Sequence, residues 1–137
     1  MPTPRDEMDA LLDALIRFAR QTLERYGEFY PFAAAVSPAG DVEMVGGSIG
    51  EEHPESQALL ARLESGLRQK ASTQQIRASG ICLDVRLPEH TPGDAIQVRL
   101  EHADAEPVNV FLPYEQSPGG VTYGELFANR GERVIFA

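Results

Sequence analysis

The chain has 137 residues, of which 42% are hydrophobic and 24% are charged. These values are typical of a globular domain, and a chain of this length buries about two-thirds of its surface on folding. We therefore expect one α+β domain over residues 1–137, with a core that needs no disulfide or metal. The 21 acidic and 12 basic residues give a net charge of −9, which argues against binding to nucleic acid or to an anionic membrane surface.

Residue usage also bears on the cellular compartment. The single cysteine, Cys82, excludes an intramolecular disulfide. The first residues contain no apolar segment of a secretory signal, and no apolar run reaches the ~18 residues of a membrane span. All basic residues except Lys70 are arginine, which is typical of a GC-rich bacterial genome. We expect a bacterial, cytoplasmic protein.

The first predicted element is a helix over residues 4–26. Thr3 and Asp6 fit a capping box, Pro4 suits the first helical position, and Gly27 fits the position after the last turn. One apolar stripe recurs at helical spacing: Met8, Leu11, Leu12, Leu15, Ile16, Ala19 and Leu23.

A β-hairpin is predicted next, with an apolar strand over residues 29–36, a turn over 37–41 and a second strand over 42–45. A second helix is predicted over residues 54–71. Its apolar face consists of Leu59, Leu60, Leu63 and Leu67.

Three strands with alternating apolar and polar residues follow at 77–87, 95–102 and 108–114. Residues 121–131 fit either a strand or a short helix over 123–130, and we favour the strand.

Residues 133–136 fit a final strand. The element order therefore predicts an α+β fold, in which an antiparallel sheet of five or more strands carries both helices on one face.

The apolar residues of the strands over 95–102 and 108–114 have even numbers, so opposed residue numbers must sum to an even number. A sum of 208 leaves a three-residue turn in which Ala105 is unfavourable. A sum of 210 places Pro107 in the loop, where its missing N–H is tolerated. We therefore expect 210, which sets His102 opposite Val108.

No cysteine or histidine spacing is typical of a metal site, and we expect neither a metal nor a cofactor. The histidines His53, His90 and His102 are widely separated. His102 is expected to be half-buried at a strand end. Cys82 is expected to be a core residue, because nothing near it in sequence would lower the pKa of its thiol.

The polar positions of the predicted sheet suggest an interface. Opposite charges on neighbouring strands can pair there: Asp84 and Arg86 on one strand, Arg99 and Glu101 on the next. Phe111 shares the outward-facing position, and an exposed aromatic residue beside arginine is typical of protein interfaces. The candidate interface residues are Phe111, Asn109, Arg86 and Arg99.

Several segments of the C-terminal half resemble those of small bacterial proteins that have no assigned activity. They are 80–85 (Gly-Ile-Cys-Leu-Asp-Val), 100–102 (Leu-Glu-His), 112–114 (Leu-Pro-Tyr), 123–128 (Tyr-Gly-Glu-Leu-Phe-Ala) and 135–136 (Ile-Phe). The resemblance implies a bacterial cytoplasmic domain and supplies no catalytic residue.

We expect a non-enzymatic binding or regulatory module that acts as a homodimer or through a protein partner. No catalytic motif is present, and an open sheet has edges that need covering. The alternative is a small enzyme or ligand-binding protein with a pocket at strand ends, formed by His102, Glu101, Tyr114 and Glu125. A third possibility is an acidic antagonist that masks a basic protein surface.

Overall fold

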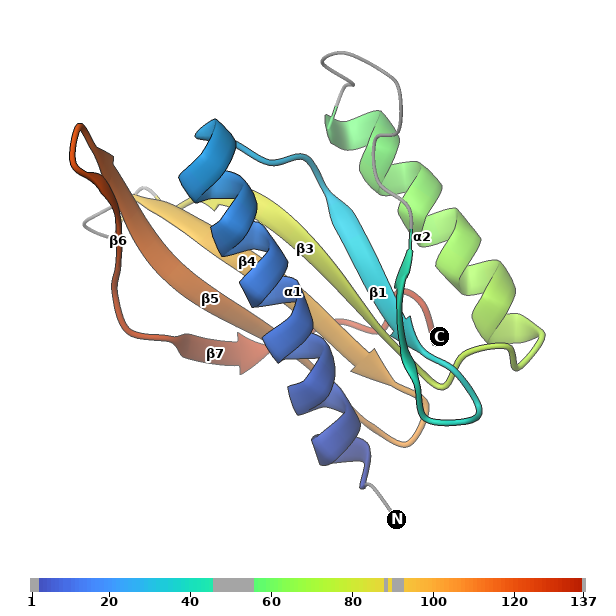
Figure 1. Cartoon of the computed structure of the whole chain (residues 1–137). Helices are drawn as coiled ribbons and strands as arrows, with labels where there is room; N and C mark the ends of the chain where they lie inside the picture. Colours follow the sequence, from blue (N-terminus) through green and yellow to red (C-terminus); the bar gives the residue numbers. More distant parts are fainter. Residues whose placement is uncertain (1–2, 46–55, 88, 90–92, 137) are drawn as a thin grey trace.

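The computed structural model describes residues 3–45, 56–87, 89 and 93–136. These residues form two helices and one seven-stranded antiparallel sheet in the predicted order, which confirms the α+β class (Figure 1). The elements are α1 (Pro4–Tyr26), β1 (Phe32–Val36), β2 (Val42–Val45), α2 (Ser56–Ser72), β3 (Ala78–Arg86), β4 (Asp94–His102), β5 (Ala105–Ser117), β6 (Gly120–Tyr123) and β7 (Phe127–Arg130). The strand order is β2-β1-β3-β4-β5-β6, and β7 also pairs with β5.

Helix α1 has the predicted boundaries because both ends are capped locally. The Thr3 side chain accepts a hydrogen bond from the backbone of Asp6, and the Asp6 side chain accepts one from Thr3. At the other end Gly27 adopts a left-handed conformation with φ of 79°, and its N–H bonds to the Leu23 carbonyl.

Gly80 allows α1 to pack closely against β3. A Cβ atom at this position would overlap the side chain of Leu15. Leu15 itself is fully buried in the layer between α1 and the sheet. The missing side chain of Gly80 therefore sets the depth at which the helix packs.

The two helices cover opposite faces of the sheet, so the expectation that both pack on one face is wrong. Ala34 and Cys82 belong to the core under α1, whereas their neighbours Ala33 and Ile81 pack with α2. The reason is that β1 contains no polar residue, and a strand with two apolar faces has to be covered on both sides. In Figure 1, α1 crosses in front of the sheet.

The expected cross-strand charge pairs do not form, because the residues lie on different faces. Ile81 is opposite Arg99, so odd-numbered residues of β3 share a face with odd-numbered residues of β4. Asp84 and Arg86 therefore lie on the α1 face, and Arg99 and Glu101 lie on the α2 face.

The β4–β5 hairpin has an even register sum, as expected, but the sum is 208 and not 210. Leu100 lies opposite Val108. Beyond it the register shifts and His102 pairs with Ala105, so the expected pairing of His102 with Val108 is wrong. Pro107 lies in the resulting bulge, where its missing N–H removes no regular ladder bond.

The C-terminal region contains two strands and then an irregular segment. Strands β6 and β7 confirm the preference for strand over helix in residues 121–131. Phe127 of β7 stacks on Phe111 with ring centroids 5.0 Å apart. Phe111 is therefore buried, and the expectation of an outward, exposed Phe111 is wrong.

Residues 133–136 are not a strand, contrary to expectation. The backbone N–H groups of Val134, Ile135 and Phe136 donate to the side-chain carboxylate of Glu101 and not to a neighbouring strand.

Neither described helix is long and apolar enough to cross a membrane. His53, His90 and the first two residues of the predicted second helix lie outside the described residues.

Candidate functional site

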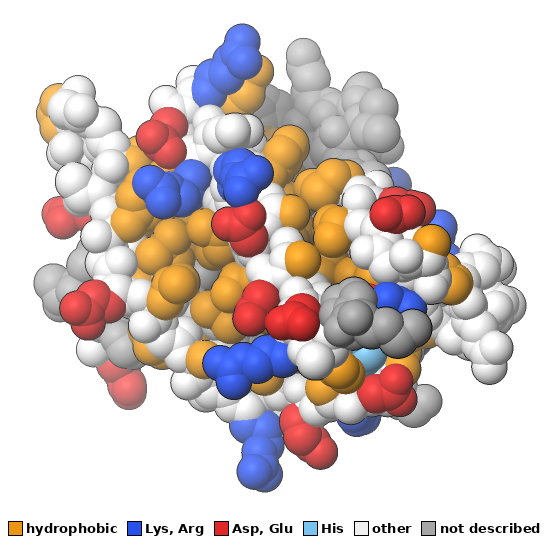
Figure 2. Space-filling view, turned by 60° about the horizontal axis from the view of Figure 1, so that its bottom comes forward, with side chains coloured by type: hydrophobic (Ala, Val, Ile, Leu, Met, Phe, Trp, Pro, Cys, Tyr) orange, Lys and Arg blue, Asp and Glu red, His pale blue; other side chains and the backbone are white. Residues whose placement is uncertain are grey.

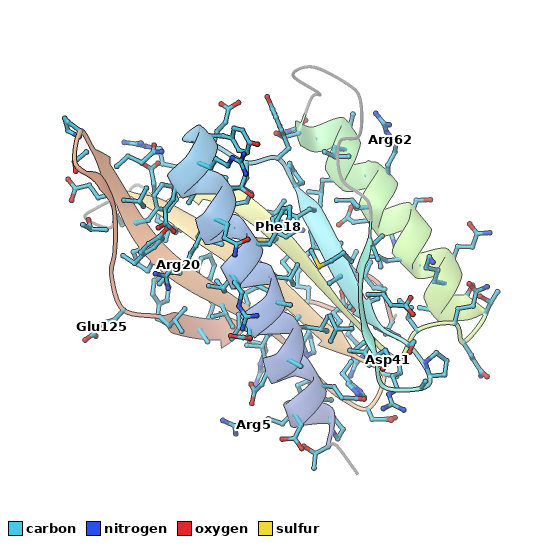
Figure 3. All side chains as sticks on the ribbon, in the orientation of Figure 1. Arg5, Phe18, Arg20, Asp41, Arg62 and Glu125 are labelled. Carbon is cyan, nitrogen blue, oxygen red and sulfur yellow. The ribbon has the colours of Figure 1, made fainter. Side chains whose placement is uncertain are left out.

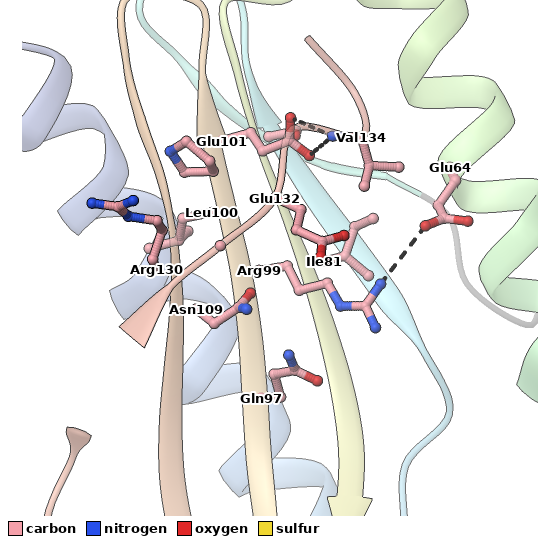
Figure 4. Close-up of a pocket in the computed structure, with 13 residues that line it drawn as sticks. Glu64, Ile81, Gln97, Arg99, Leu100, Glu101, Asn109, Arg130, Glu132 and Val134 are labelled. Atoms are coloured by element: carbon pink, nitrogen blue, oxygen red, sulfur yellow. Dashed lines mark hydrogen bonds and ion pairs between the residues drawn. The ribbon is translucent and has the colours of Figure 1, made fainter. Parts of the chain in front are cut away.

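A polar cavity of about 300 Å³ lies on the α2 face of the sheet (Figure 4). Strands β3, β4 and β5 form its floor, α2 forms one wall, and residues 130–134 form the other. Its principal polar side chains are Glu64, Gln97, Arg99, Asn109, Arg130 and Glu132.

The sheet register brings three of these side chains together. Arg99 on β4 lies directly opposite Asn109 on β5. Gln97 is two residues from Arg99 on the same strand, so its side chain emerges on the same face. The floor of the cavity therefore presents one guanidinium group and two amides at neighbouring positions.

Arg99 is only loosely engaged by the protein. Its Nη1 atom lies 3.7 Å from Oε2 of Glu64, an ion pair that is too long for a hydrogen bond. The Arg99 side chain is 36% exposed and that of Glu64 is 20% exposed. Within the described chain, no hydrogen bond is made by the side chains of Arg99, Gln97 or Asn109, so their polar groups are open to a ligand.

Glu101 fixes the wall opposite α2. Its carboxylate accepts hydrogen bonds of 3.0 to 3.1 Å from the consecutive N–H groups of Val134, Ile135 and Phe136. Arg68 of α2 donates to the carbonyl of Val134 at 2.9 Å. Because Glu101 is buried and Ile135 packs in the α2 core, this wall is held at several points.

His102 belongs to the other side of the sheet and does not line the cavity. Its Nε2 atom is 2.8 Å from Oε1 of Glu7, and its Nδ1 atom accepts from the backbone N–H of Asp104 at 3.0 Å. Because a backbone N–H only donates, Nε2 carries the proton and donates to Glu7. The side chain is fully buried and not half-buried. In the view of Figure 2, the pale blue of histidine occupies only a small area beside orange hydrophobic and red acidic side chains.

Glu7 is the centre of this buried cluster. Arg77 donates from Nε at 2.7 Å and from Nη2 to the Oε2 atom of Glu7. Burial opposes the charge on Glu7, but the hydrogen bonds from Arg77 and His102 outweigh it and lower the pKa of this carboxyl.

The four residues expected to form a ligand pocket do not meet. Tyr114 pairs with Asp94 at the far end of β4, roughly 26 Å along the strand from His102. Its hydroxyl donates to Asp84 at 2.6 Å. Glu125 is exposed between β6 and β7 and points away from the sheet (Figure 3). Only Glu101 lines the cavity.

Two of the four expected interface residues, Arg99 and Asn109, line the cavity. Arg86 is 76% exposed, and its Nη1 atom lies 3.6 Å from Oδ1 of Asp94. Sequence reasoning missed Glu64, Gln97, Arg130 and Glu132. For Gln97, the alternation with Arg99 along one strand is a usable signal, whereas the two walls come from distant segments with no common motif.

Cys82 offers no reactive thiol in this structure. It is fully buried in the α1 layer, and burial raises the pKa of its thiol. Among the described residues, no group of three or more His, Cys, Asp or Glu side chains is placed to hold a metal ion.

Comparisons with protein-family models, curated proteins and solved structures found no match.

Proposed function

We propose that the protein is a non-enzymatic binding module, with the cavity between α2, the sheet and residues 130–134 as its ligand site. The observation that carries the proposal is the convergence of Gln97, Arg99 and Asn109 on one floor, without hydrogen bonds from the described protein. Such polar groups in a concave site orient a ligand. The ligand is a small polar molecule whose oxygen atoms accept from these donors.

Arg99 is the anchor in this proposal. A partly exposed ion pair such as that with Glu64 contributes about 0–1 kcal/mol. A ligand carboxylate that binds the guanidinium through two short hydrogen bonds is held more strongly. Arg99 is therefore available to a ligand at small cost to the protein.

Binding is favoured over catalysis by where the reactive side chains lie. The thiol of Cys82 and the imidazole of His102 both face the α1 layer, on the side of the sheet away from the cavity. His102 is also committed to Glu7 and Asp104 through its two ring nitrogens.

Native mass spectrometry of protein purified from its own host tests the proposal. We expect a retained small molecule in the wild type and in Arg86→Gln, whose exposed arginine lies outside the cavity. We expect its loss in Arg99→Gln. The absence of a retained molecule, together with no Arg99-dependent thermal stabilisation by a library of small polar compounds, would contradict the proposed site.

Self-association is a second proposal, favoured by one observation. Val42 and Met44 on β2 are 38% and 51% exposed, and β2 lies at one of the two ends of the described sheet. Large apolar side chains on an outer strand are suited to contact with a second copy. Analytical ultracentrifugation should show a dimer that Met44→Lys dissociates, and a monomer at tens of micromolar wild-type protein rejects this proposal.

A further inference from the structure

The cavity carries charges of both signs in an uneven arrangement. Glu64 on the α2 wall and Glu132 on the opposite wall flank Arg99 on the floor. Figure 4 shows the Glu132 side chain on the same side of the cavity as the Arg99 guanidinium, whereas the guanidinium of Arg130 points away from it. Around Arg99, two carboxylates therefore face one cation.

Glu101 does not add to this excess, because its oxygens are already used. They accept from the backbone N–H groups of Val134, Ile135 and Phe136. By contrast, Glu64 has the long 3.7 Å contact with Arg99, and its side chain is only 20% exposed. A partly desolvated carboxylate with one loose partner is favourably placed to accept from a further cation.

These features restrict the chemistry of the ligand. A purely acidic molecule would satisfy Arg99 but would bring another negative charge beside Glu64 and Glu132. A simple amine would satisfy the carboxylates but would leave the donors of Arg99, Gln97 and Asn109 without an acceptor. A molecule that carries both groups satisfies both sets, because an ammonium has three donors and a guanidinium has five.

Resting on the proposed ligand site, we infer that the cavity binds a small amphoteric molecule of the amino-acid type. Its carboxylate is held by Arg99, and its ammonium group lies between Glu64 and Glu132. The volume of about 300 Å³ is that of a site for a small molecule, and the amides of Gln97 and Asn109 bind a polar side chain.

Isothermal titration calorimetry with three matched probes tests this inference. L-Glutamine carries both charged groups, 4-aminobutanamide lacks its carboxylate, and glutaramate lacks its ammonium group. We expect glutamine to bind at least about 10-fold more tightly than either of the others, because each charged hydrogen-bonded contact contributes about that factor. Equal binding of glutamine and one single-charge probe overturns the inference.

Two substitutions test which protein residue binds each charged group of the ligand. Glu64→Gln should weaken glutamine and 4-aminobutanamide but not glutaramate, and Arg99→Gln should weaken glutamine and glutaramate. Glu43→Gln, on the exposed outer strand β2 and outside the cavity, should change none of these affinities. A Glu64→Gln protein that binds all three probes like the wild type overturns the inference.

The failure of this inference is distinguishable from that of the proposed function. If a small polar compound that lacks the carboxylate or the ammonium group binds in an Arg99-dependent manner and amino acids do not, the site stands and the amphoteric class is rejected. If no compound binds in an Arg99-dependent manner, the ligand site itself is rejected, and the inference with it.

Discussion

Glu7 in α1 and His102 at the end of β4 are joined by a hydrogen bond of 2.8 Å, although 95 residues separate them in sequence. Arg77, just before β3, holds the other oxygen of Glu7. A buried carboxylate remains charged only where donors of this kind replace water. The cluster therefore ties the N-terminal helix to the turn of the β4–β5 hairpin.

Glu7→Gln should lower the free energy of unfolding by about 1–3 kcal/mol, because the charge-assisted bonds to Arg77 and His102 are lost. Asp13→Asn is the matched control on the same helix. Asp13 forms an exposed i,i+4 ion pair with Arg17, and the loss of this ion pair should lower the free energy of unfolding by about 0–1 kcal/mol. Chemical denaturation at pH 7 checks both values, and equal losses would show that the buried cluster adds no stability.

The same carboxyl predicts a dependence of stability on pH. The pKa of Glu7 is lowered in the folded protein from its ordinary value of 4.5, so the unfolded state binds the proton more readily. The contribution of Glu7 to the free energy of unfolding is fully present above that ordinary pKa. It is lost as the pH falls through the pKa that Glu7 has in the folded protein. Denaturation curves of wild type and Glu7→Gln should converge below about pH 4.5, and a constant difference into acid would contradict this assignment.

Leu15→Ala should lower the free energy of unfolding by about 2–5 kcal/mol, since Leu15 is fully buried against Gly80 and its truncation leaves a cavity. Leu126→Ala, at a position that is 54% exposed, should cost less than about 0.5 kcal/mol. Thermal and urea unfolding measure both. A loss of unfolding free energy below about 1 kcal/mol for Leu15→Ala would contradict the expectation that truncation of this buried side chain of α1 leaves a destabilising cavity.

The first helix could be predicted from sequence because its determinants are local. Thr3, Asp6 and Gly27 act within a few residues of the helix ends, and the apolar stripe repeats at one period. The placement of the two helices on opposite faces of the sheet is not a local property. It depends on which apolar side chains of the strands point toward α1 and which point toward α2. The uninterrupted apolar run of β1 was the available sign that both faces are covered.

Only the floor of the candidate site could be predicted from the sequence. Alternation along β4 and β5 places Arg99 and Asn109 at polar positions, and these positions do line the cavity. The walls depend on Glu64 and Glu132, which tertiary packing brings to the same sheet face. The hydrogen bonds that three backbone N–H groups donate to the Glu101 carboxylate also have no sequence signature, and they are why residues 133–136 do not form the expected strand.

Glu101→Ala should release the cavity wall formed by the C-terminal residues. Without the carboxylate, the N–H groups of Val134, Ile135 and Phe136 lose their acceptor, and their amide hydrogens should exchange faster. Amides in α1, on the other face, should exchange as in the wild type. Hydrogen exchange resolved by residue checks this, and unchanged protection at residues 134–136 would show that the wall is held without Glu101.

The central claim, that the polar cavity is the ligand site, is tested most directly by NMR. The side-chain amide signals of Gln97 and Asn109 and the Nε signal of Arg99 are followed while the compound that most raises the melting temperature is added. We predict that these signals shift together and saturably, and that Arg99→Gln abolishes the shifts of the two amides. Saturable binding that leaves all three signals unchanged would contradict the claim.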